Sequence, residues 1–130
     1  MFDLIKHIDG GINAIENNLL MTDGEAATLG EALKLVSGRL TKAAATDTPE
    51  FIALRTQAAE SPSKTIIPVI RVTEVDEFET TSIAAVASTL VGQKVTLHTD
   101  GLQVTATTTS GVFTISSTDG VSKVRGYFRR

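Results

Sequence analysis

Few residues in this chain have the types and spacing that chemistry needs. It has two histidines, His7 and His98, and no cysteine, which excludes disulfides, thiolate metal sites and thiol catalysis. A zinc site would need three or four converging ligands, and no spacing of histidines and carboxylates indicates one. His98 and Asp100 would share one side of a strand, but at a turn. We therefore expect Asp100 to serve the turn and His98 to be solvated.

Patterns for nucleophilic catalysis and phosphate binding are missing from the sequence. There is no Gly-x-Ser-x-Gly, and no serine has a histidine close to it in the chain, so nothing would activate a nucleophile. Neither of the glycine-rich phosphate-binding patterns, Gly-x-Gly-x-x-Gly and Gly-x-x-x-x-Gly-Lys-Ser/Thr, occurs. We expect a protein that is not an enzyme and that holds no cofactor and no metal.

One acidic run, made of Glu74, Asp76, Glu77 and Glu79, has three interpretations. Clustered carboxylates suit a calcium or magnesium ion, although the Asp-x-Asp-x-Asp-Gly loop is missing. A solvated acidic loop or strand edge, which resists pairing with other strands, is the simplest interpretation. A surface patch that steers the domain to a basic partner is the third.

The C-terminal residues are basic and carry two aromatic side chains. The residues concerned are Lys123, Arg125, Tyr127, Phe128, Arg129 and Arg130. Such a stripe is faintly similar to a nucleic-acid-binding surface. Charges gathered at a chain end are more often a docking or solubility feature, and this is the interpretation that we favour.

Length, composition and charge indicate one ordinary globular domain over residues 1–130. The chain is 42% hydrophobic and has a net charge of −3, so general binding to nucleic acid or to an anionic membrane is not expected. No apolar run approaches the roughly 18 residues that span a bilayer. Residues 1–10 lack the apolar region of a signal peptide. We expect a soluble, non-exported domain.

The elements that would position any site are mainly strands. The residues from Lys64 onward are rich in Thr, Val, Ile and Ser, which suit a pleated surface. Strands are predicted at 66–72, 94–99, 102–107, 112–116 and 121–128, with type I′ Asp-Gly turns at Asp100-Gly101 and Asp119-Gly120. Pro68 restricts its position to an edge, a strand start or a bulge.

The first half has weaker signals. A hairpin is predicted from 31–35 through Ser37-Gly38 to 39–42, with a further strand at 48–54 and one short helix at 81–90. The fold class is therefore a small antiparallel β-barrel or sandwich with at most one or two short helices. Nine residues are expected to point inward: Leu33, Leu35, Ile52, Val69, Val95, Leu97, Val104, Val112 and Val124.

Three stretches, at 30–54, 66–72 and 91–112, together with the opening MFDLIKHIDG, resemble small structural proteins that decorate the heads of tailed bacteriophages. The shared pattern is Gly-x-Ala-Leu, a short strand, Ser-Gly, a second strand, an Ala-rich turn and Pro-x-Phe-Ile. The resemblance covers most of the chain, and its motifs are turns and strands without a chemical signature.

This resemblance implies a cement function on the outer surface of the head. The chain would be made in the bacterial host cytoplasm and would bind and reinforce the assembled lattice of the major capsid protein. A symmetric homo-oligomer, most plausibly a trimer, would multiply weak contacts. The alternative is another virion β module, such as a tail- or fibre-associated adhesion or carbohydrate-binding domain.

We expect the capsid contact or self-interface to involve residues at the chain ends and in the acidic run. They are Phe2, Leu4, Ile5, Glu74, Asp76, Glu77, Arg129 and Arg130. Residues 1–10 could form an N-terminal docking arm that adds a strand to a neighbour's edge. The other interpretation of Phe2, Leu4 and Ile5 is a first strand that packs on the domain's own core, and both stay open.

Overall fold

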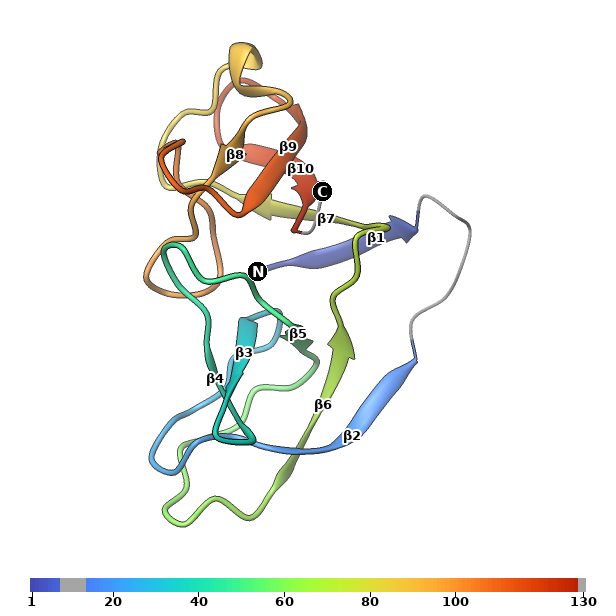
Figure 1. Cartoon of the computed structure of the whole chain (residues 1–130), viewed down its shortest axis with the longest axis vertical. Helices are drawn as coiled ribbons and strands as arrows, with labels where there is room; N and C mark the ends of the chain where they lie inside the picture. Colours follow the sequence, from blue (N-terminus) through green and yellow to red (C-terminus); the bar gives the residue numbers. More distant parts are fainter. Residues whose placement is uncertain (8–13, 129–130) are drawn as a thin grey trace.

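Two five-stranded antiparallel sheets make up the computed structural model, which describes residues 1–7 and 14–128 (Figure 1). The first sheet has the order β1 (Asp3–His7), β7 (Asp76–Thr81), β10 (Lys123–Tyr127), β9 (Phe113–Thr118) and β8 (Lys94–Val95). The second has the order β2 (Ile15–Leu20), β6 (Ile66–Arg71), β5 (Phe51–Ala53), β3 (Ala32–Val36) and β4 (Arg39–Lys42). The mainly β prediction is confirmed, in the form of a sandwich-like fold that is not closed into a barrel.

The main core lies between the sheets and takes side chains from both. Ile52 and Ile70 of the second sheet join Phe78, Phe113 and others of the first sheet in one buried cluster. Four phenylalanines, Phe2, Phe78, Phe113 and Phe128, stack within it with ring centroids 4.9–5.8 Å apart. Such tilted aromatic contacts add to the burial of the rings themselves.

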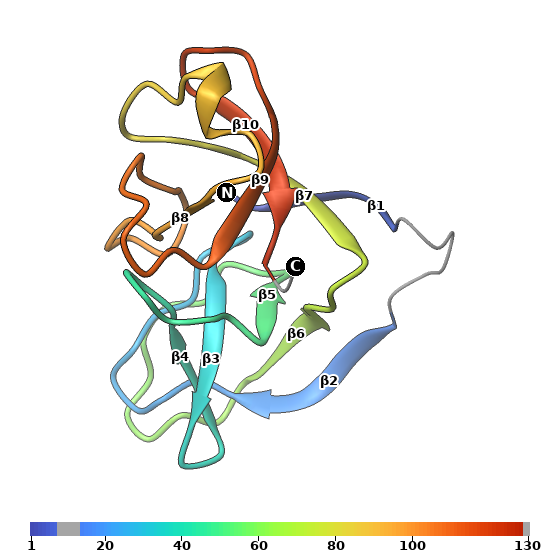
Figure 2. The same ribbon diagram turned by 45° about the horizontal axis from the view of Figure 1, so that its top comes forward.

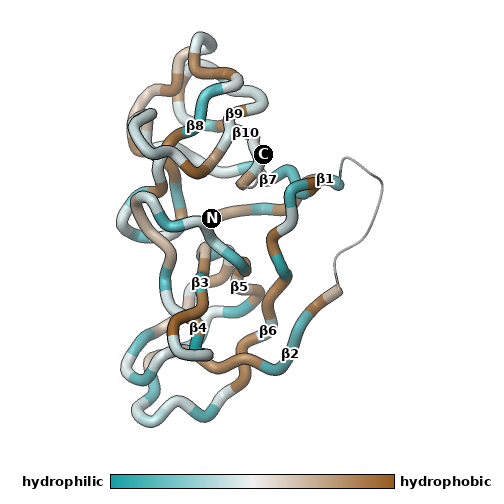
Figure 3. The backbone as a smooth tube through the Cα atoms, viewed as in Figure 1, coloured by the Kyte–Doolittle hydropathy of each residue, from teal (hydrophilic) through white to brown (hydrophobic). Residues whose placement is uncertain are grey.

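A second core covers the opposite face of the second sheet. Phe51 and Ala53 point into it, whereas Ile52 between them points into the main core. The sheet curls over this second core, because Met21, just beyond β2, makes a parallel bridge to Leu40 of β4. Strands buried on both faces read as continuous apolar runs, and this accounts for the brown stretches along β6 in Figure 3.

The predicted hairpins around Ser37-Gly38 and Asp119-Gly120 are present, whereas the predicted strands at 94–99 and 102–107 are reduced to β8 and an isolated bridge between Leu97 and Val104. The type I′ geometry occurs at a turn for which it was not predicted. Ser37 and Gly38 both have positive φ, 51° and 77°, as a type I′ turn requires. In the Asp100-Gly101 and Asp119-Gly120 turns only the glycines have positive φ, so the type I′ prediction is wrong there. Each aspartate instead accepts hydrogen bonds from backbone N–H groups that follow it.

Pro68 lies inside the second sheet, where β6 has β2 on one side and β5 on the other. The β2–β6 register shifts between Glu16 and Leu19, so two residues of β2 lie across from Pro68. The irregularity removes the need for the N–H that proline lacks. On the other side, the Pro68 carbonyl accepts a hydrogen bond from Leu54 N at 2.9 Å. Of the three predicted settings for Pro68, the bulge is the one that occurs.

Two further sequence predictions of detail are wrong. The helix at 81–90 is missing, because β7 continues to Thr81 and Ser82 then bridges to Val104, which leaves only a 3₁₀ turn at Ser88–Leu90. Leu35 is 36% exposed although the other eight predicted core residues are buried. It lies near the tip of the β3–β4 hairpin, beyond the point where β5 covers β3.

Candidate docking groove and acidic pocket

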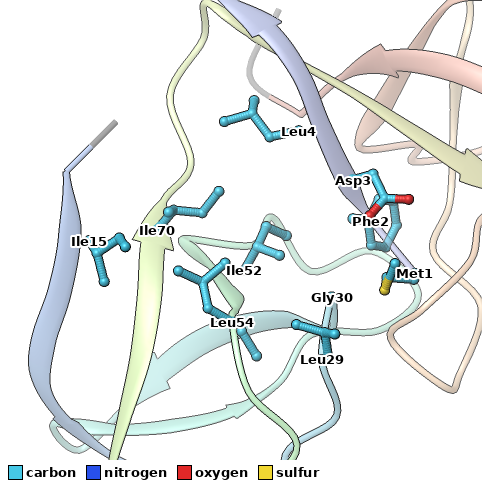
Figure 4. A pocket seen from close by; sticks show the side chains of 11 residues that line it. Met1, Phe2, Asp3, Leu4, Ile15, Leu29, Gly30, Ile52, Leu54 and Ile70 are labelled. Atoms are coloured by element: carbon cyan, nitrogen blue, oxygen red, sulfur yellow. The ribbon is translucent and has the colours of Figure 1, made fainter. Parts of the chain in front are cut away.

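An apolar groove opens between the edge strands β1 and β2, which lie on the same side of the molecule in both views of the ribbon (Figures 1 and 2). Its volume is about 390 Å³. Leu4 of β1 and Ile70 of β6 lie around the same hollow, with Ile15 and Leu29 flanking it (Figure 4). The lining is Met1, Phe2, Asp3, Leu4, Ile15, Leu29, Gly30, Ile52, Ala53, Leu54 and Ile70. The groove can therefore accept apolar side chains of a partner.

Large apolar side chains at the groove face solvent. Ile15 is 59% exposed, Leu29 45% and Met1 46%. Within the described residues, β1 pairs only with β7 and β2 pairs only with β6. The groove is thus bordered by two strand edges with backbone groups directed away from their own sheets, which is the arrangement that strand addition uses.

An acidic pocket of about 430 Å³ lies next to the groove. It is lined by Gly24, Glu25, Ala26, Thr28, Glu31, Lys42, Asp100 and Leu102. Two of its carboxylates are held in place. Glu25 accepts hydrogen bonds from Thr41 Oγ1 at 2.6 Å and from Lys42 N at 2.7 Å. Asp100 accepts hydrogen bonds from Leu102 N and Gln103 Nε2, and its pKa lies below the ordinary value although partial burial opposes this.

The third carboxylate, Glu31, is buried and only partly satisfied. The residue is 4% exposed, and its Oε2 has no hydrogen-bond partner among the described residues. Burial raises the pKa of Glu31 to about 7, against the opposing effects of a hydrogen bond with the Thr28 backbone and of the Lys42 charge. Burial therefore keeps this carboxyl protonated to a higher pH than an exposed glutamate.

The segment from Thr28 to Glu31 separates the two hollows. Leu29 and Gly30 line the groove, whereas Thr28 and Glu31 line the acidic pocket. Gly30 has φ of +80°, and a Cβ there would overlap the Met1 side chain. Glycine is therefore needed for the chain to turn between the hollows.

The predicted N-terminal contact residues lie in and beside the core. Phe2 is 2% exposed within the phenylalanine cluster, and Leu4 is half-buried against it. Ile5 is 37% exposed. β1 pairs with β7 through Asp3, Leu4, Lys6 and His7. In this arrangement residues 2–7 form a strand of the domain, as in the second of the two interpretations, and residues 8–10 of the arm lie outside the described residues.

The acidic run is distributed between surface and interior. Only Glu74 is largely exposed, whereas Asp76 and Glu77 are 0% and 6% exposed. Asp76 contacts His7, and Glu77 accepts a hydrogen bond from Ser116 and pairs with Lys6. Asp76 and Glu77 are therefore not available to a partner in this arrangement, contrary to the expected contact patch. The described residues contain no group of three His, Asp or Glu side chains that could hold a metal ion.

The residues of the basic C-terminal run are likewise partly ion-paired and partly buried. Lys123 and Arg125 both pair with Glu79 of the neighbouring strand, and Phe128 is buried in the core. Of the two aromatic rings in this run, Phe128 is thus taken up by packing and Tyr127 is half-buried. Arg129 and Arg130 lie outside the described residues.

The prediction for Asp100 is confirmed, whereas the prediction for His98 is wrong. Asp100 serves the turn through its backbone hydrogen bond with Leu102 N, as predicted. His98 is half-buried, not solvated, because the turn folds back against the body of the domain.

Two of the predicted contact residues, Phe2 and Leu4, line the groove, but sequence reasoning missed its other lining residues and the acidic pocket. Glu31 carries no sequence signal, since it stands singly before the strand at 32–36. The turn at 100–102, which is 69 or more residues further along the chain, lies beside Glu31 and contributes to its burial. Gly101 O accepts a hydrogen bond from Ala32 N there.

Comparison with known proteins does not place this chain in a family. No protein-family model matches the chain, and no curated protein matches it significantly. Among the described residues, no helix has the length and apolar character needed to cross a membrane.

Proposed function

We propose that this protein is a structural component of a bacteriophage head, which binds the outer surface of the assembled capsid and stabilises it. The observation that carries the proposal is the apolar groove between β1 and β2, where the exposed side chains of Ile15 and Leu29 flank one continuous apolar hollow. Contiguous exposed apolar surface on a small domain is characteristic of a protein contact. The sequence resemblance supplies the identity of the partner.

Docking through this groove would use side chains and backbone together. An extended segment of the capsid protein could add to the edge of β1 or β2, and its alternate side chains would fill the hollow beside Leu4 and Ile70. Because the protein would bind the assembled shell and not the dissociated subunits, docking would stabilise the shell by mass action.

A trimer is the proposed docked form. Closed symmetric assemblies are the usual form of homo-oligomers, and three linked copies would raise the overall affinity of individually weak contacts. Cryo-microscopy of decorated heads measures this directly, and isolated monomers at every occupied position would contradict the trimer.

Co-sedimentation with expanded, undecorated heads tests the function. The wild-type chain should pellet with heads at saturable stoichiometry and should raise the temperature at which the heads disrupt. A chain that stays in the supernatant at all concentrations would overturn the proposal.

A pair of matched variants tests the groove. Ile15→Asp places a charge at the groove, whereas Val121→Asp places the same charge at another exposed position, 65% exposed, in the β9–β10 loop. We expect both variants to keep the wild-type melting temperature and only Ile15→Asp to lose at least tenfold in affinity for heads. Equal affinities of the two variants would remove the groove from the docking surface.

A further inference from the structure

The acidic pocket contains a buried carboxylate, Glu31, that the proposed docking through the apolar groove does not involve. Glu31 is more than nine-tenths buried and is one of the residues that line the pocket. Its Oε2, which is itself buried, has no hydrogen-bond partner among the described residues. Buried polar groups are almost always satisfied. On a residue that lines a hollow of about 430 Å³, a buried carboxylate oxygen without a partner therefore indicates a missing donor for the ionised side chain.

The charges around the pocket define the donor as a cation. Glu25, Glu31 and Asp100 contribute three carboxylates, and Lys42 contributes one positive charge. Glu31 Oε2 has no hydrogen-bond partner in the described part of the chain, so the Lys42 ammonium does not supply the missing donor. With Glu31 ionised, the lining has a net charge of −2.

The available oxygens suit an ammonium group better than a metal ion. Each ionised carboxylate offers about four acceptor sites. The hydrogen bonds given above for Glu25 and Asp100 occupy one site on each of their oxygens. A primary ammonium has three donors, and the lining offers these remaining sites and Glu31 Oε2 as candidate acceptors. No group of three potential metal ligands occurs in the described ranges.

We propose that the acidic pocket is a socket for a lysine side chain of the protein on which this chain docks. Glu31 forms the buried ion pair, and Glu25 and Asp100 complete the acidic surroundings. The inference rests on the proposed function for the identity of the partner. The position of the pocket supports it, because only the Thr28–Glu31 segment separates it from the apolar groove. A partner that presents an apolar side chain and a nearby lysine would fill both hollows.

A small-molecule titration tests the socket without heads. The carboxyl ¹³C resonance of Glu31 in the full-length protein is followed by NMR during titration with n-butylammonium chloride. Tetramethylammonium chloride is the control probe, because it has the same charge and no N–H donor. We expect a saturable shift with n-butylammonium only, accompanied by a lower titration midpoint for Glu31. Equal responses to the two cations, or no response, would overturn the socket.

Head binding by charge variants tests the source of the lysine. Glu31→Gln keeps the shape of the side chain and removes its charge, and Glu74→Gln removes one charge from an exposed position as the matched control. We expect Glu31→Gln to bind heads at least tenfold more weakly and Glu74→Gln to bind like wild type. If wild type binds heads and Glu31→Gln binds equally well, a docking lysine is excluded. If wild type itself does not bind heads, the proposed function fails, and the lysine of a capsid partner fails with it whatever n-butylammonium does.

Discussion

Replacing Glu31 by glutamine is expected to stabilise the free protein at neutral and alkaline pH and to change its stability little in acid. In the folded chain the carboxyl is 4% exposed, and burial raises its pKa to about 7 from the ordinary value of 4.5. The charged form is therefore disfavoured by folding. Three charged groups face Glu31 across the pocket: Lys42 favours its ionisation, and Glu25 and Asp100 oppose it.

The direction and size of the effect follow from proton linkage. Between pH 4.5 and about pH 7 the folded state holds a proton on Glu31 that the unfolded state has lost. Stability is thus fully present below the unfolded pKa and declines as pH rises through the folded pKa. A difference of about 2.5 units at about 1.36 kcal/mol per unit corresponds to about 3 kcal/mol. Glu31→Gln has no such loss.

Urea denaturation followed by circular dichroism at several pH values from about 4 to about 8 measures the effect. The quantity of interest is the free energy of unfolding of Glu31→Gln minus that of wild type, because all other titrating groups cancel in this difference. It should rise by about 2 to 3 kcal/mol from the acid to the alkaline end. Glu74→Gln is the matched control. A difference that stays flat within about 0.5 kcal/mol, or that falls with pH, would refute the burial argument for Glu31.

Three further substitutions test the packing. Leu97→Asp should destabilise the protein by several kcal/mol in urea denaturation, because it buries a charge without a partner at a 2% exposed site; a change below about 1 kcal/mol would contradict the core assignment. Phe2→Ala should cost about 3 to 5 kcal/mol, whereas an unchanged melting temperature would favour a docking arm over a core strand. Gly126→Ala should cost about 1 to 3 kcal/mol, since its Cβ would lie 2.1 Å from the Thr114 carbonyl oxygen; wild-type stability would show that β9 and β10 separate easily.

The strands and hairpins that the sequence predicts are those with purely local causes. The alternation of Leu33 with its neighbours and the Ser37-Gly38 turn specify the β3–β4 hairpin without reference to the rest of the chain. The helix prediction at 81–90 failed for the complementary reason. Ser82 there hydrogen bonds through its N–H to Ser122 O, a contact that lies 40 residues away and that no local pattern reveals.

The candidate site was beyond sequence reasoning because each part of it depends on distant segments. The groove needs β1 and β2 to border different sheets, which follows from the β1–β7 and β2–β6 pairings. Likewise, the carboxylates of the acidic run are taken up by cross-strand partners, such as Arg125 for Glu79 at 3.0 Å. The spacing of charges along the sequence could not distinguish those partners from solvent.

The cost of leaving Glu31 unpaired indicates what its position does. About 3 kcal/mol is a large part of the roughly 5 to 15 kcal/mol by which a domain is stable. An uncharged side chain of similar size would avoid that cost, so Glu31 does not serve the stability of the free chain. On the other side of the same short segment, Ile15 and Leu29 leave apolar surface in water at a further cost. The proposed docking would relieve both costs at once, because a partner that covers the groove and places a cation beside Glu31 removes the apolar surface from water and pairs the carboxylate. If the two hollows serve docking in this way, the free energy that they cost the free chain would be recovered only on the assembled surface.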